Sequence, residues 1–197
     1  MIDGYVHVIA GLAVCSRAAD VWTTYLVSPT LKLEANPVAR RFGWKFALLT
    51  VFVGLVAYAS PPMGVALLTT SFLVAASNAS KIVMAKAMGE EQLAAFSRRV
   101  TLETPPWPGL LFLVMPAFFI ATLGGAILFF YPQESEWGYF FGLGMLAYAG
   151  AIFLWYPVRY FRVRAEAKKV AVTPRCSHHS RLRNHMGQVC CHVLTFG

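Results

Sequence analysis

Residues 109–131, GLLFLVMPAFFIATLGGAILFFY, form an apolar run without a charged side chain. A second run, WGYFFGLGMLAYAGAIFLWYP, covers residues 137–157. An α-helix needs about 20 predominantly apolar residues to cross the hydrocarbon core of a bilayer, and both runs reach that length. They predict two membrane spans and therefore an integral membrane protein.

The composition of the whole chain agrees with this class. Of its 197 residues, 57% are hydrophobic and 13% are charged, against roughly 45–50% and 25% in a soluble domain. The two runs and the composition together predict an all-α polytopic membrane helix bundle. Its five transmembrane helices are expected at about residues 5–28, 38–60, 63–86, 109–131 and 137–158. Residues 1–160 form the predicted transmembrane domain, and residues 161–197 are predicted to be a basic, disordered cytoplasmic tail.

The second of these spans has the shortest uninterrupted apolar stretch, residues 46–59. It becomes long enough if Asn36 caps the helix and Pro37 takes the first helical position, which proline favours. The following Ser60-Pro61-Pro62 predicts a sharp turn into the third span, since proline disfavours helix in the residue before it.

Basic residues are distributed unevenly over the loops. Of the 17 Lys and Arg residues, all except Arg17 lie in the segments 29–45 and 81–108 or after Pro157. The segments that face the other side in a five-span arrangement carry no Lys or Arg. Because cytoplasmic loops are enriched in Lys and Arg, we predict an N-out, C-in multi-pass membrane protein.

The excess of basic residues gives the chain a pI of about 9.6. In a membrane protein such an excess reports orientation and attraction to anionic lipids, and the chain contains no nucleic-acid recognition motif. The predicted partners are therefore the lipid bilayer and anionic lipid headgroups at the cytoplasmic face, with no nucleic acid. A protein partner or a homo-oligomer is left open.

One pair of charges lies well inside a predicted span. Arg17 and Asp20 are spaced i, i+3, so they share a helix face and can neutralise each other. Asn78 and Lys81 in the third span lie at a similar depth, because both spans run from outside to inside. These four residues, with Thr24 beside them, predict a polar core in the inner half of the bilayer.

Two interpretations of this polar core stay open. Ionisable residues inside a membrane are by default candidates for a functional site. A buried structural pair that holds helices in register is the alternative. For Lys81 there is a further alternative, in which its amine extends along the helix to the membrane interface.

The stretch Asp20-Val21-Trp22-Thr23-Thr24, followed by Glu34-Ala35-Asn36-Pro37, is the most distinctive pattern in the chain. It resembles an uncharacterised family of small prokaryotic integral-membrane proteins, a domain of unknown function, with a D-x-x-T-T … E-x-N-P signature. The likeness covers about residues 13–85. It implies a helical, multi-pass protein of the plasma (inner) membrane of a prokaryote, and it brings no known reaction.

Glu34 and Asn36 are expected to cap the second helix near its positive end, with Asp20 and Thr24 approaching from the first. Such a cluster suits a cation, a proton or a lipid headgroup. It equally suits a clasp between two helices, with no ligand.

The segment after Pro174 is rich in cysteine and histidine. Its spacing matches no standard zinc motif, so no metal is predicted and a basic tail near anionic lipid is favoured. The alternative metal ligands are Cys176, His178, His179, His185, Cys190, Cys191 and His192.

No motif in the chain assigns a reaction to it. The G-x-S-x-G, H-E-x-x-H and Walker patterns are absent. The sequence favours a non-enzymatic accessory subunit or a small-solute or ion-handling protein, without a cofactor. The alternative is a membrane enzyme that acts on lipid at the cytoplasmic face, with Asp20 or Glu34 as base.

Overall fold

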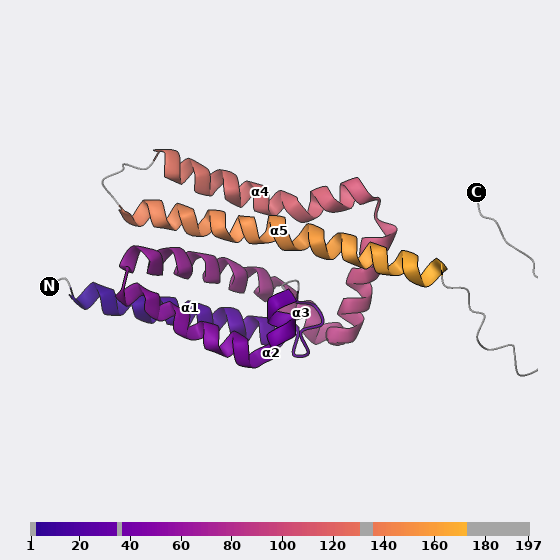
Figure 1. The fold of residues 1–197 in the computed structure, drawn as a ribbon, viewed down its shortest axis with the longest axis horizontal. Coiled ribbons are helices and arrows are strands. Elements are labelled where there is room, and N and C mark those ends of the chain that lie inside the picture. Colours follow the sequence, from indigo (N-terminus) through magenta and orange to yellow (C-terminus); the bar gives the residue numbers. More distant parts are fainter. Residues whose placement is uncertain (1–2, 35–36, 131–135, 173–197) are drawn as a thin grey trace, which may run out of the picture. The chain divides into compact units, whose positions relative to one another are not determined.

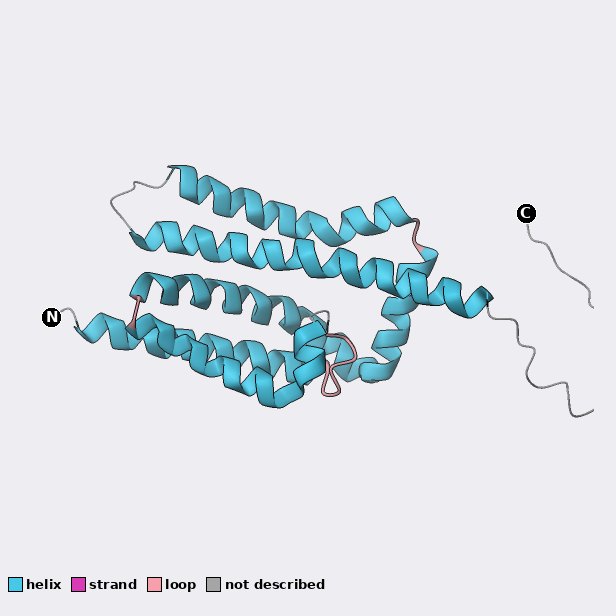
Figure 2. Ribbon diagram, viewed as in Figure 1, coloured by secondary structure: helices cyan, strands magenta, loops and turns pink. Residues whose placement is uncertain are grey.

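The computed structural model describes residues 3–34, 37–130 and 136–172, and its regular elements are helices (Figures 1 and 2). This confirms the all-α prediction. In chain order they are α1 (Asp3–Val27), α2 (Pro37–Leu49), the 3-10 helix η1 (Thr50–Tyr58), α3 (Pro61–Glu103), α4 (Pro106–Phe130) and α5 (Glu136–Val172).

Four helical segments among the described residues are long and apolar enough to cross a membrane. They are Val38–Tyr58, Pro61–Glu103, Pro106–Phe130 and Glu136–Lys169. The 25-residue α1 is not among them, and the charges of Arg17 and Asp20 in its second half lower its hydropathy. The bundle is of the kind found in multi-pass membrane proteins, and a membrane crossing by α1 stays a prediction.

The second predicted span is divided into two parts. Helix α2 starts at Pro37, bends at Gly43 and passes into η1 at Thr50. Gly43 has φ 69°, a conformation that glycine adopts without a side-chain clash. A 3-10 helix rises about 2.0 Å per residue against about 1.5 Å in an α-helix. The 3-10 segment therefore lets a short apolar stretch reach further than an α-helix would.

Helix α3 is much longer than the predicted span 63–86. It continues for 43 residues and changes direction at Gly89, where φ is 78° and ψ is 159°. In Figure 1 the part beyond this bend leaves the direction of the first part and leads to α4. The residues that follow Gly89 therefore form the second arm of a bent helix. We call residues 90–103 the α3 arm.

Small residues allow the first helices to approach closely. A Cβ atom at Gly54 would lie 2.7 Å from the backbone nitrogen of Val14, so η1 lies directly against α1. A Cβ atom at Gly64 would lie 2.5 Å from the Cβ of Ala57, which brings α3 against η1. Small residues at membrane-helix contacts have this effect, because they let the backbones come together.

Helix α5 packs against α4 and α3. A Cβ atom at Gly142 would lie 2.9 Å from the carbonyl oxygen of Gly124 in α4. The main buried cluster combines α4 and α5 residues and has partly buried α3 residues packed against it. Its buried members are Ala117, Tyr148, Ala149 and Ile152.

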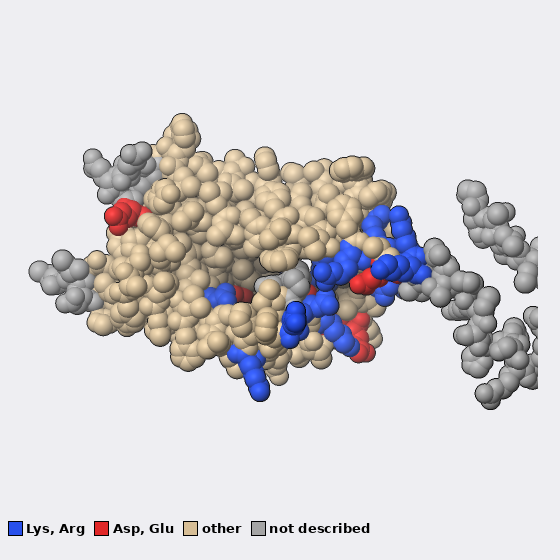
Figure 3. Space-filling model, in the orientation of Figure 1, with Lys and Arg blue, Asp and Glu red and all other residues tan. Residues whose placement is uncertain are grey.

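Residues 1–164 form one compact unit, and the sites discussed below lie within it. Helix α5 continues beyond this unit to Val172, so the predicted start of the tail at residue 161 falls inside a helix. On the face drawn in Figure 3 most of the surface is uncharged.

Candidate functional site

Arg17 and Asp20 form an ion pair in the second half of α1. Nη1 of Arg17 donates to Oδ2 of Asp20 over 2.6 Å, and Nη2 donates to Oγ1 of Thr50 over 2.8 Å. The side chain of Arg17 is 21% exposed and that of Asp20 is 11% exposed. The pair therefore joins α1 to the start of η1 in a largely buried position.

One helical turn further along, Thr24 connects α1 to α3. Nδ2 of Asn78 donates a hydrogen bond to Oγ1 of Thr24 over 2.9 Å. The prediction that Asp20 and Asn78 lie at similar depth agrees with this contact, because Thr24 follows Asp20 by one turn.

Lys81 and Arg159 bring two more positive charges to the same region. Nζ of Lys81 lies 3.5 Å from the hydroxyl of Tyr156, and no carboxylate among the described residues lies within ion-pair distance of it. Arg159 donates from Nη1 to the carbonyl oxygen of Leu33. One amine is therefore held by a neutral hydroxyl, and one guanidinium by a loop carbonyl.

These side chains surround a cavity of about 370 Å³ between α1, α2, η1, α3 and α5, which we call the polar chamber. Its walls carry three basic and two acidic side chains. They are Arg17, Asp20, Glu34, Lys81 and Arg159. With all five groups ionised, the chamber has a surplus of one positive charge.

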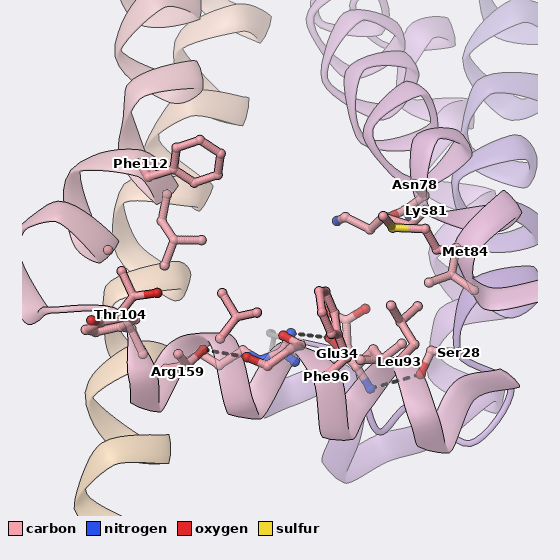
Figure 4. A pocket seen from close by; sticks show the side chains of 18 of the residues that line it. Ser28, Glu34, Asn78, Lys81, Met84, Leu93, Phe96, Thr104, Phe112 and Arg159 are labelled. Atoms are coloured by element: carbon pink, nitrogen blue, oxygen red, sulfur yellow. Dashed lines mark hydrogen bonds between the residues drawn. The ribbon is translucent and has the colours of Figure 1, made fainter. Parts of the chain in front are cut away.

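A larger cavity of about 720 Å³ adjoins the chamber and is bounded by the α3 arm, α4 and α5 (Figure 4). We call it the apolar pocket. Figure 4 shows Asn78, Lys81 and Met84 on one side of it and Phe112 on the other. The two cavities share six lining residues, so they adjoin at these side chains. The shared residues are Thr24, Leu33, Glu34, Asn78, Lys81 and Arg159.

Glu90, the first residue of the α3 arm, holds the loop between α1 and α2. Its carboxylate accepts hydrogen bonds from the Ser28 hydroxyl at 2.5 Å and from the backbone nitrogens of Thr30 and Lys32 at 3.0 and 3.1 Å. Partial burial raises the pKa of Glu90, but these hydrogen bonds outweigh it and hold the pKa below its usual value. We call this arrangement the Glu90 clasp.

The clasp positions Glu34, whose side chain lines both cavities at the end of the loop. Trp44 donates from its indole nitrogen to the carbonyl oxygen of Pro29 over 2.8 Å, so the loop is also fixed from α2. Glu34 lies within electrostatic range of both Asp20 and Arg159. The loop is thus part of the chamber wall.

The structure brings Arg17, Asp20 and Thr24 together with Asn78 and Lys81 around one space. Glu34 joins them, whereas Asn36 lies outside the described residues.

Two residues were missed by the sequence reasoning. Arg159 was counted only as a loop charge, although its position two residues after Pro157 at the end of a span was a signal for a partly buried role. Glu90 was not among the predicted site residues, and no local pattern connects it to Ser28, because 62 residues separate them.

Among the described residues, no group of three or more His, Cys, Asp or Glu side chains is arranged to hold a metal ion. The cysteine and histidine residues considered as alternative metal ligands lie between 176 and 192, outside the described residues.

Comparison with known proteins gives no match, whether with family models, curated proteins or solved structures. The resemblance to the D-x-x-T-T … E-x-N-P family therefore stays a prediction.

Proposed function

We propose that this chain is a non-enzymatic, multi-pass protein of a prokaryotic plasma membrane that binds a small anionic solute in the polar chamber. In this proposal α1 is the first of five spans, the amino terminus lies outside, and the chamber lies in the cytoplasmic half of the bilayer.

The proposed topology is supported by the apolar helices and by the distribution of basic residues between them. Four segments are long and apolar enough to cross, and a crossing by α1 keeps the basic loops on one side, as the distribution of Lys and Arg requires. Reporter fusions after Pro61, Gly89, Ser135 and Lys169 should alternate out, in, out, in. A cytoplasmic signal at Ser135 would rule out the five-span arrangement.

The observation that carries the proposal is the charge surplus of the chamber. Asp20 is paired with Arg17, whereas Lys81 contacts only the neutral hydroxyl of Tyr156 among the described residues. An ionised group inside a membrane protein is costly unless an opposite charge compensates it. A bound anion beside Lys81 supplies the missing negative charge.

The ion pair also favours binding over catalysis. The Arg17 guanidinium donates a hydrogen bond to the Asp20 carboxylate over 2.6 Å, so this carboxylate is already engaged in an ion pair within the protein and suits a counter-ion better than a general base. The enzyme alternative predicts that Asp20→Asn or Glu34→Gln changes lipid turnover. If both variants insert and fold normally and lipid turnover stays unchanged, that alternative fails.

The direct test is calorimetric titration of the purified full chain with inorganic phosphate at constant ionic strength. We expect saturable binding that Lys81→Gln weakens by about tenfold, because one lost charge contact is worth about 1.4 kcal/mol or more. The matched control is Lys86→Gln, since Lys86 is exposed on the same helix and lines neither cavity. Absence of phosphate binding to the unsubstituted chain, or equal loss in both variants, would overturn the proposal.

A further inference from the structure

We propose that the anion held by the polar chamber is the headgroup of an anionic membrane lipid, and that the acyl chain of this lipid lies in the apolar pocket. This inference rests on the proposed function, because it names the class of ligand for the same site.

The first argument is adjacency. The chamber and the pocket share six lining residues, so a ligand whose anionic end contacts Lys81 lies at the boundary of both cavities. A small solute would fill only the chamber and leave the pocket of about 720 Å³ unused. A ligand with a polar end and a long apolar end uses both.

The second argument is the chemistry of the pocket wall. Away from the shared residues the wall is formed mainly by hydrocarbon and aromatic side chains, among them Leu93, Phe96, Val100 and Phe112. Some of its hydroxyl groups are engaged within the protein: Thr101 donates to the carbonyl oxygen of Ser97 over 2.8 Å. The remaining wall suits hydrocarbon, since a polar group placed there would lose its hydrogen bonds to water.

The third argument is the position of the charges. The charged residues that line the pocket are Glu34, Lys81 and Arg159, and all three belong to the set shared with the chamber. Positive charge is therefore in excess at one end of the pocket. This polarity matches a lipid, in which one anionic group stands at the end of an apolar chain.

Selectivity should come from the headgroup. A chain that leaves the bilayer for an apolar pocket moves from one hydrocarbon environment to another, so it gains little from the hydrophobic effect. The electrostatic contact with Lys81 and Arg159 is what distinguishes one lipid from another. An anionic lipid should therefore bind in preference to a zwitterionic lipid with the same chains.

A substitution in the apolar pocket can test binding of the acyl chain separately from binding of the headgroup. Val100 lines the pocket but not the chamber, and 45% of it is exposed, so Val100→Trp projects a large ring into the chain path. The matched control is Val83→Trp, because Val83 is 74% exposed and lines neither cavity.

The experiment is native mass spectrometry of the purified full chain in neutral detergent, titrated with phosphatidylglycerol or with phosphatidylcholine of the same chains. We expect one phosphatidylglycerol per chain, bound about tenfold more tightly than phosphatidylcholine. Lys81→Gln should remove this preference. Val100→Trp should weaken phosphatidylglycerol binding about tenfold while phosphate binding stays unchanged, and Val83→Trp should change neither.

The outcomes separate the two proposals. Equal binding of both lipids to the unsubstituted chain, with phosphate binding intact, overturns the lipid inference and leaves the anion site standing. If the unsubstituted chain also binds no phosphate, both the lipid inference and the proposed anion site are overturned. A measurement without any variant completes the test: phosphatidylglycerol must displace bound phosphate from the unsubstituted chain, and failure to displace it also overturns the lipid inference.

Discussion

Replacing Asp20 by Asn keeps the size of the side chain and removes its charge, so it isolates the guanidinium of Arg17 inside the bundle. In the native chain Arg17 donates to Asp20 over 2.6 Å and to Thr50 over 2.8 Å. The variant keeps the second contact and loses the charge of the first. The buried Nε of Arg17 has no hydrogen-bond partner among the described residues, so no contact at this atom compensates for the lost charge.

The magnitude follows from the geometry. At 2.6 Å and an effective dielectric constant of about 20, the gross attraction is about 6 kcal/mol. Much of this attraction offsets the cost of removing both charges from water, whereas loss of one partner leaves that cost uncompensated for the other. Removal of one partner of a buried pair typically costs about 3–5 kcal/mol. We expect Asp20→Asn near the lower end, because 21% of the Arg17 side chain is exposed.

The assay is reversible unfolding of the purified chain in mixed micelles, followed by circular dichroism. Arg17→Met combined with Asp20→Asn serves as the comparison, because it removes both charges. We expect the double variant to recover most of the lost stability. A cost below about 0.5 kcal/mol for Asp20→Asn, or a double variant less stable than the single one, would refute the view that the pair is buried and mutually compensating.

The remaining predictions concern packing and the Glu90 clasp. Gly54→Ala places a Cβ 2.7 Å from the backbone of α1 and should lower the free energy of unfolding by about 1–3 kcal/mol in the same assay. Gly125→Ala, where nothing lies within 4 Å of the added Cβ, should not lower it. Equal effects of the two substitutions would contradict the close approach of η1 to α1. Gly89→Ala forces alanine to a positive φ and should cost about 1–3 kcal/mol; an unchanged stability would show that the bend does not need glycine. Glu90→Gln should raise amide hydrogen exchange at residues 30–33, and unchanged exchange would contradict the clasp. Because the folded-state pKa of Glu90 is lowered, its stabilisation is present above the usual value of 4.5 and should be lost as the pH falls below it; the same acid sensitivity in Glu90→Gln would assign that loss to another group.

The helical class was predictable because each apolar run carries its own signal. The run of residues 109–131 meets the length requirement alone, and α4 covers Pro106–Phe130. The five segments were located to within a few residues at most ends. The bend at Gly43 and the 3-10 helix after it were not predicted, since hydropathy reports which residues are apolar and not how many residues a turn contains.

The candidate site was predictable only in part. Equal depth placed Asp20 beside Asn78, because two spans that run in the same direction can be counted from one surface. Arg159 and Leu33, which are in contact, lie 126 residues apart in the sequence. The apolar pocket depends on the direction that α3 takes after Gly89. Both are set by tertiary packing, which a single sequence does not encode in any local pattern.

The account depends most on α1 crossing the bilayer, because only then do the charges of Arg17 and Asp20 lie inside the membrane. The direct measurement uses a chain whose native cysteines are replaced by serine, with Gly4→Cys or Lys32→Cys as the single thiol, and a membrane-impermeant maleimide applied to intact cells. Both positions are exposed; Gly4 lies in the first turn of α1, and Lys32 lies in the loop that follows its last turn. Labelling of Gly4→Cys in intact cells, and of Lys32→Cys only after permeabilisation, is the predicted result. Labelling of both positions from the same side would contradict it.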